Sequence, residues 1–187
     1  HTLRLTDVTD LETEHEYLKV DVANLDQVVA ATDGMDAIVN LSVVRHDRKL
    51  AFDVNVRGCY NMMSAAAAHG VQRVINTGPH YTVAGPTYER FDHRIGPDIP
   101  PQPGTYLYAH TKSLGQEICR VFTESDDIYV MALLFYMFLD AETYKFLPDS
   151  SVTETGKDLT PYTISWRDAA EAFGCALDVE LENLPSR

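Results

Sequence analysis

The stretch YLKVDVANLDQVVAATDGMDAIVNLSVV, residues 17–44, decides the fold. It opens with a short apolar run, residues 17–22, after which Asn24 can cap a helix that ends near Gly34. Residues 35–44 are almost continuously apolar, which is typical of a parallel strand covered on both faces. This order predicts two parallel strands joined by a helix.

The alternation of strand and helix continues on both sides of this stretch. A short alternating run precedes it, residues 2–8, with Asp7 near its end. Downstream, the sequence predicts a helix over 48–69 closed by Gly70, a strand over 71–78, a helix over 105–123 and a strand over 128–138. Repeated alternation predicts the α/β class with a doubly wound parallel sheet.

The pentapeptide YAHTK contains the residues with the clearest catalytic chemistry, Tyr108 and Lys112. A helix turns once in 3.6 residues, so both side chains lie on one face, one turn apart. A nearby ammonium favours the phenolate, which brings a hydroxyl with a pKa near ~10 towards use as an acid or base at neutral pH. The alternative is a packed tyrosine beside a solvated lysine.

Taken together, these segments resemble the extended short-chain dehydrogenase/reductase family, whose members include NAD-dependent sugar epimerases and dehydratases. Residues 20–42 resemble its third strand, helix and fourth strand, and residues 53–75 resemble its asparagine-bearing helix and fifth strand. Residues 106–112 carry the tyrosine and lysine, and SWRDAAEAF, residues 165–173, is similar to a late segment of the substrate region. The resemblance implies a Rossmann-type fold, NAD as cofactor, and a homodimer formed through the helices at 48–69 and 105–123.

No GxxGxxG motif occurs in the chain. In a nucleotide-binding βαβ unit the glycine-rich turn lies ~20 residues before the acid that holds the adenosine ribose. If Asp7 is that acid, the turn precedes His1, so we expect a truncated domain. The expected organisation is an NAD-binding core lacking its first βα unit over residues 1–136 and a partial, small substrate-binding region over residues 137–187.

The cofactor choice depends mainly on Asp7, whose carboxylate can accept hydrogen bonds from both ribose hydroxyls and would repel a 2′-phosphate. NAD is therefore favoured over NADP, although Arg4 is a nearby cation. The resemblance implies further cofactor contacts at Asp21, Val22, Leu41, Ser42, Val43, Arg45, Asn55, Lys112 and Tyr136. For Asp7 and Asp21 the alternative is turn chemistry at strand ends.

The third member of the catalytic set departs from the family pattern. The family places a serine or threonine just after the fifth strand, where it hydrogen-bonds the substrate oxygen. Here residues 76–85 read NTGPHYTVAG, with Pro79 or His80 at that position. Thr77 is the preferred substitute and His80 the second, since a neutral imidazole can also donate a hydrogen bond.

The substrate side also departs from the nucleotide-sugar enzymes, because Leu134 and Met137 stand where those enzymes have an arginine and an asparagine. A small sugar, sugar acid or polyol fits better. We expect an NAD-dependent oxidoreductase that transfers hydride between such a substrate and NAD through Tyr108 and Lys112. The alternatives are a nucleotide-sugar epimerase or dehydratase with tightly bound NAD, and a non-catalytic NAD(P)-binding sensor.

The composition of the chain limits which classes of partner the protein can bind. A net charge of −13 argues against nucleic acids and anionic membranes, which require clustered cations. No apolar run approaches the ~18 residues of a membrane span, and we expect a cytoplasmic enzyme with a small-molecule substrate. Cys59, Cys119 and Cys175 are expected to be reduced packing thiols. No metal is expected, since His80, Asp92 and His93 lack a fourth ligand at a diagnostic spacing.

Overall fold

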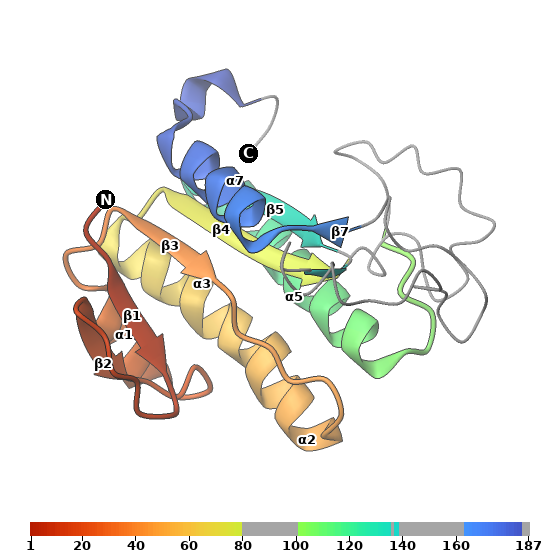
Figure 1. Ribbon diagram of the computed structural model, residues 1–187. Helices are drawn as coiled ribbons and strands as arrows, with labels where there is room; N and C mark the ends of the chain where they lie inside the picture. The colour runs from red at the N-terminus through yellow and green to blue at the C-terminus, as the bar shows by residue number, and fades with distance from the viewer. Residues whose placement is uncertain (80–100, 136, 139–162, 185–187) are drawn as a thin grey trace, which may run out of the picture.

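Parallel β-structure forms the centre of the molecule (Figure 1). The computed structural model describes residues 1–79, 101–135, 137–138 and 163–184. Its strands are β1 (Arg4–Asp7), β2 (Glu16–Lys19), β3 (Ala37–Asn40), β4 (Arg73–Pro79), β5 (Tyr129–Phe135), β6 (Met137–Phe138) and β7 (Thr163–Ile164). The pair β1–β2, the sheet β3–β4–β5 and the pair β6–β7 are all parallel.

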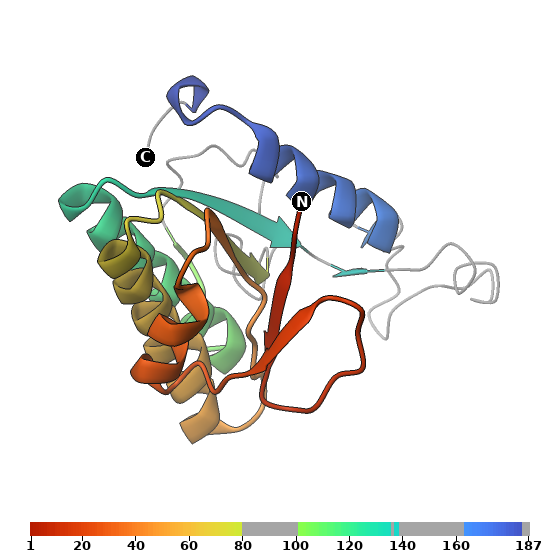
Figure 2. The same cartoon turned by 90° about the vertical axis from the view of Figure 1, so that its left-hand side faces the viewer.

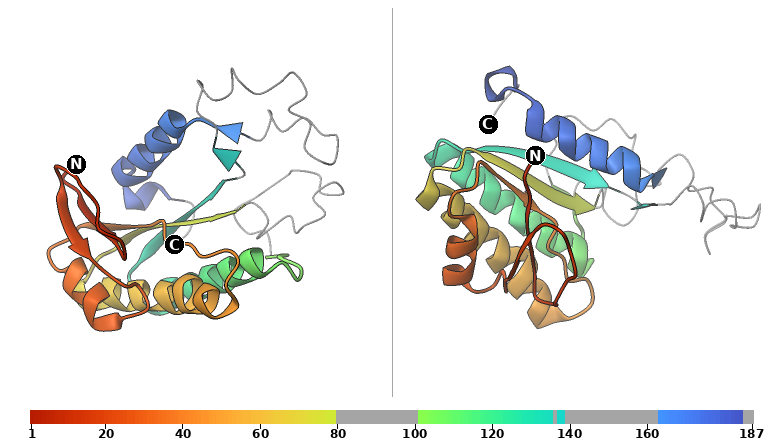
Figure 3. Two further views of the ribbon diagram at one scale, coloured as in Figure 1. Left: turned by 60° about the horizontal axis from the view of Figure 1, so that its bottom comes forward. Right: turned by 60° about the vertical axis from the view of Figure 1, so that its left-hand side comes forward.

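Helices cover both faces of the central sheet. They are α1 (Leu25–Thr32), α2 (Arg48–Ala51), α3 (Gly58–His69), α5 (Leu107–Ser125) and α7 (Trp166–Asp178), with a π-helical segment η1 (Phe52–Arg57) and a 3₁₀ turn (Leu181–Asn183). Figure 3 shows α1, α3 and α5 on one face and α7 on the other, and the rotated view in Figure 2 agrees. The predicted α/β fold with a doubly wound parallel sheet is confirmed.

Within the described residues, the first two strands are not hydrogen-bonded to the central sheet. Among the strands that the structure describes, β1 pairs with β2 alone and β3 pairs with β4 alone, so the two groups of strands are separate. Helix packing connects them, since α1 packs against α3. In addition, Nδ2 of Asn61 on α3 donates to the carbonyl oxygen of Val22 after β2, at 2.8 Å.

Local signals account for the ends of the helices. The side chain of Asn24 accepts a hydrogen bond from the backbone N–H of Gln27 and caps α1. Gly70 ends α3 with φ +69°, the left-handed conformation that glycine adopts most easily. Ser165 caps α7 by accepting from the N–H of Asp168 at 3.0 Å. The predicted helix over 48–69 is continuous, and η1 forms its middle part.

The core lies between the central sheet and the helices α3 and α5. Its largest fully buried side chains include Met63 on α3 and Val74 and Ile75 on β4. Cys59 and Cys119 meet where α3 and α5 pack, with 3.6 Å between their sulfur atoms. All three cysteines are free thiols on helices, and Cys175 is exposed. None of the helices in the described ranges is long and apolar enough to cross a membrane.

Gly115 lies where α5 crosses η1, and the crossing leaves no room for a side chain. A Cβ at Gly115 would lie 2.9 Å from the backbone oxygen of Asn55 and 3.5 Å from Sγ of Cys59. Because the nearer atom belongs to the backbone, it cannot move aside without shifting η1. We expect Gly115→Ala to lower the free energy of unfolding by roughly 1–3 kcal/mol, as overpacking does in other cores. Urea denaturation measures this difference.

Gly174 on α7 provides the matched control, because a Cβ there would meet no atom within 4 Å. Gly174→Ala should leave stability unchanged or raise it by up to about 1 kcal/mol through helix propensity. A Gly115→Ala variant as stable as the parent protein would contradict the close crossing of α5 and η1.

Candidate active site

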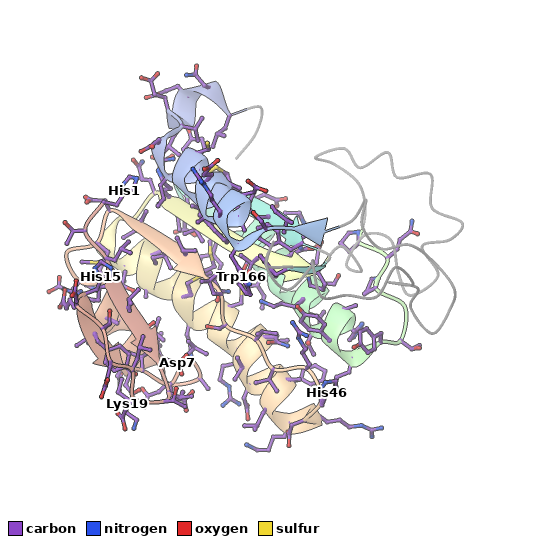
Figure 4. All side chains as sticks on the ribbon, viewed as in Figure 1. His1, Asp7, His15, Lys19, His46 and Trp166 are labelled. Carbon is purple, nitrogen blue, oxygen red and sulfur yellow. The ribbon has the colours of Figure 1, made fainter. Side chains whose placement is uncertain are left out.

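Several of the predicted site residues lie near or just beyond the carboxyl ends of β1, β2, β3 and β4, and Tyr108 and Lys112 lie on α5. Asp7 ends β1, Ser42 follows β3, and Thr77 lies near the end of β4. Figure 4 labels Asp7 at the end of its strand. In open α/β sheets, ligands bind outside this edge.

Lys112 connects α5 to the loop after β3. Its side chain is only 4% exposed, and Nζ donates to the carbonyl oxygen of Ser42 at 2.8 Å. Burial lowers the pKa of Lys112 to about 8, because desolvation disfavours the ammonium form. Lys112 can therefore change its protonation state near neutral pH, unlike an exposed lysine.

Asn55 lies in η1 and contacts both the loop after β3 and helix α5. Its Oδ1 accepts from the N–H of Val44 at 2.9 Å, and its Nδ2 donates to the carbonyl oxygen of Val44 at 2.7 Å. Nδ2 also lies 2.9 Å from Oγ1 of Thr111, the residue before Lys112. Asn55 belongs to η1, and π-helical segments are frequent at functional sites. Its contacts are those of a residue that orders the loop and holds α5 in place.

Tyr108 lies in the first turn of α5, one turn before Lys112. Its ring packs edge to face on Tyr106, with 6.3 Å between centroids. Arg45, on the loop after β3, lies over the same ring, with its Cζ 5.2 Å from the ring centroid. The ring of Tyr108 therefore lies beside a guanidinium, in the first turn of a long helix, whose amino end carries a partial positive charge.

Two asparagines, which the sequence analysis did not single out, connect β3 and β4 and fix the start of the loop after β3. Nδ2 of Asn40 on β3 donates to Oδ1 of Asn76 on β4 at 2.9 Å, and Oδ1 of Asn40 accepts from the N–H of Ser42 at 3.1 Å. The signal was available, because each is a polar residue inside an apolar strand. Thr77 donates its hydroxyl to the carbonyl oxygen of Asn40 at 2.7 Å. A substrate oxygen would have to compete with this carbonyl for the Thr77 proton.

The predicted adenosine-binding residues make local contacts of their own. Oδ1 of Asp7 accepts from the N–H and the hydroxyl of Thr9, both at 2.9 Å, and these bonds lower the pKa of Asp7. Oδ1 of Asp21 accepts from the N–H of Ala23 at 2.9 Å. Val22 packs so closely on α3 that a Cβ at Gly58 would lie 2.7 Å from its Cγ2. Cofactor contacts at these positions stay predictions.

The other predicted site residues lie on the loop after β3 or outside the described ranges. Leu41, Val43 and Arg45 are exposed on the loop after β3, whereas Ser42 is half-buried. His80 and Tyr136 lie outside the described residues, as do Asp92 and His93. Within the described ranges, no group of three or more His, Cys, Asp or Glu side chains could hold a metal ion.

A parallel sheet covered on both faces, with a tyrosine and a lysine one turn apart on the helix between β4 and β5, is the arrangement expected of the short-chain dehydrogenase/reductase class. The model of the 3-beta hydroxysteroid dehydrogenase/isomerase family matches residues 2–121. The chain belongs to this family. The resemblance to the extended short-chain dehydrogenases/reductases is confirmed.

A relative and a solved structure that the chain resembles are both uronate dehydrogenases, in agreement with this class. Uronate dehydrogenase from Agrobacterium fabrum (strain C58 / ATCC 33970) is 30% identical over 109 residues, which are 57% of this chain and 40% of that protein. The crystal structure of uronate dehydrogenase from Agrobacterium tumefaciens has the same fold, with a TM-score of 0.75 at 23% identity over 96% of this chain and 64% of that one.

A short-chain dehydrogenase/reductase superfamily protein from Agrobacterium tumefaciens, solved with bound NAD, is 26% identical. It gives a TM-score of 0.63 over 74% of this chain and 42% of its own. The present chain thus spans less than two thirds of the length of each of these three proteins.

Proposed function

We propose that the protein is an NAD-dependent oxidoreductase that oxidises a small sugar acid. The observation that carries the proposal is the position of Tyr108 and Lys112 on α5, with Lys112 held at the end of β3 by the Ser42 carbonyl. The relatives named uronate dehydrogenase support a sugar acid within the wider class of sugar-like and polyol substrates.

NAD, when bound, supplies the acceptor for the hydride that leaves the substrate carbon. The chain's own residues would handle the proton. Tyr108 would remove the proton of the substrate hydroxyl as that carbon becomes a carbonyl, and Lys112 would favour the ionised phenol. Thr77, or His80 outside the described ranges, would hold the substrate oxygen. The hydrogen bonds of Asn55 to Val44 and Thr111 would hold the loop after β3 against α5.

The preference for NAD over NADP rests on the charges around Asp7. The lowered pKa of Asp7 keeps this carboxylate ionised at neutral pH, where it would repel a 2′-phosphate. Arg4, the nearby cation, is already occupied: Nη1 donates to the carbonyl oxygens of Ala31 at 2.9 Å and Asp33 at 2.7 Å. Nε of Arg4 also lies 3.0 Å from Oε1 of Glu16. Arg4 is therefore poorly placed to bind the phosphate of NADP.

We expect the intact protein to bind NAD at least about ten times more tightly than NADP, a difference of about 1.4 kcal/mol. Asp7→Ser should bring the two dissociation constants, measured by calorimetric titration, close together. Asp10→Asn is the matched control, because Asp10 pairs with Lys19 at 3.1 Å and should leave the ratio unchanged. Equal affinities of the parent protein for both nucleotides would refute the role of Asp7.

The activity itself is tested by following reduced nicotinamide in absorbance while NAD is offered with a series of uronates, aldoses and polyols. Turnover with uronates supports the proposal, and absence of turnover with every compound contradicts it. We further propose a homodimer formed through α3 and α5, which light scattering on the intact protein would test.

A further inference from the structure

Arg45 stands out among the exposed cations because of its contact with the Tyr108 ring. Its guanidinium carbon lies 5.2 Å from the ring centroid. A cation within about 6 Å of an aromatic face is attracted by the ring quadrupole. Among the described carboxylates none forms an ion pair with Arg45, so its charge is not neutralised there.

Within the part of the chain that the structure describes, two elements bring charges close to Tyr108. On α5, Lys112 lies one turn further along, and the amino end of the helix adds a partial positive charge. On the loop after β3, Arg45 lies over the ring, and His46 is the next residue. Asp47 is engaged as the N-cap of α2, where its Oδ1 accepts from the N–H of Leu50 at 2.8 Å. The contact with Arg45 thus adds a permanent positive charge beside the Tyr108 ring.

We propose that Arg45 stabilises the ionised form of the Tyr108 phenol and so acts on catalysis through Tyr108 as a positioning residue. This inference rests on the proposed function, since the ionised phenol is the base that accepts the substrate proton. The role differs from the cofactor contact expected for Arg45 from the sequence. It also gives a reason for an exposed arginine to lie over a ring whose charge rises in the proposed reaction.

The size of the effect follows from the distance. A unit charge about 5 Å from the ring, on a side chain exposed to solvent, moves the pH of half-ionisation of the phenol by roughly half a unit to one unit. Removing a cation disfavours the ionised phenol, so ionisation then requires a higher pH. The acid limb of the kcat/KM profile, which reports the free enzyme's base, should move in the same direction.

The test compares the pH profile of kcat/KM for oxidation of the best substrate in the parent, Arg45→Gln, Arg45→Lys and Arg48→Gln. We expect the acid limb of the Arg45→Gln profile to move to higher pH by roughly half a pH unit to one pH unit. The shift should be smaller in high salt, because exposed charges are screened. Arg45→Lys should restore most of the parent profile. Arg48→Gln, which removes an equally exposed charge on α2, should leave it unchanged.

Two results would overturn the inference while leaving the proposed function in place. One is a parent enzyme that turns over and an Arg45→Gln profile that superimposes on it. The other is a weaker NAD affinity in Arg45→Gln with no movement of the acid limb, which would indicate a cofactor contact instead.

A spectroscopic arm keeps the two proposals separate if the parent shows no turnover. Tyrosinate absorbance is titrated in each protein and in its Tyr108→Phe counterpart, so that the difference isolates one phenol among the chain's ten tyrosines. The inference is supported if the pH at which half of the Tyr108 phenol is ionised is higher in Arg45→Gln than in the parent. Equal midpoints refute it.

Discussion

We expect Tyr108→Phe to lower the rate of NAD reduction by about 10²- to 10⁴-fold, because positioned acids and bases contribute that much to catalysis. Phenylalanine keeps the ring, so the contacts with Tyr106 and Arg45 remain. The free energy of unfolding should change by no more than about 1.5 kcal/mol, the value of one hydrogen bond. NAD affinity should be unchanged. The rate is followed by nicotinamide absorbance and the affinity by calorimetric titration.

Tyr106→Phe is the matched control for this variant. Tyr106 lies two residues earlier, at the N-cap of α5, and forms no side-chain cap hydrogen bond. Its hydroxyl has no proposed part in proton transfer, so the variant should keep the parent rate within about threefold, less than 1 kcal/mol. If Tyr108→Phe is as active as a parent that turns over, Tyr108 is not the proton acceptor. If the parent turns over none of the compounds, the dehydrogenase proposal is wrong and the non-catalytic sensor becomes the better interpretation.

The parts of the fold that could be predicted from sequence depend on local chemistry. Asn24 and Gly70 set helix ends through their own side-chain and backbone properties, and the structure has both in those roles. The apolar runs located the parallel strands, but not their lengths. β3 ends at Asn40, although the apolar pattern continues to Val44, because the Asn40 side chain accepts the N–H of Ser42 and redirects the chain.

The parts of the site that could not be predicted are contacts between distant segments. The motif predicted that Tyr108 and Lys112 share a helix face, since that requires only helical periodicity. It gave no sign that Arg45 would lie over the Tyr108 ring or that Asn55 would contact Thr111. Such contacts depend on how the loop after β3 packs against α5, and one sequence carries no direct signal for that packing.

Lys112→Met should reduce both turnover and NAD affinity, because Lys112 is proposed to favour the Tyr108 phenolate and to bind the nicotinamide ribose. We expect turnover to fall by about 10²-fold or more, the lower end of acid–base contributions. Lys49→Met is the matched control, since Lys49 is an exposed lysine paired with Asp53 at 2.9 Å. Loss of turnover with unchanged NAD affinity would remove the ribose contact from the proposal, whereas parent-like turnover would remove Lys112 from catalysis.

The same substitution also tests the burial of Lys112 through the pH dependence of stability. Burial lowers the pKa of Lys112 from its ordinary value of 10.5 to about 8, so the unfolded chain holds this proton more tightly than the folded protein does. Stability therefore rises with pH between about pH 8 and 10.5. Methionine does not titrate, so the parent's free energy of unfolding should rise relative to that of Lys112→Met by up to roughly 3 kcal/mol. Urea denaturation of both proteins across this window measures the difference, and a difference that stays constant with pH would mean that Lys112 is hydrated in the folded protein.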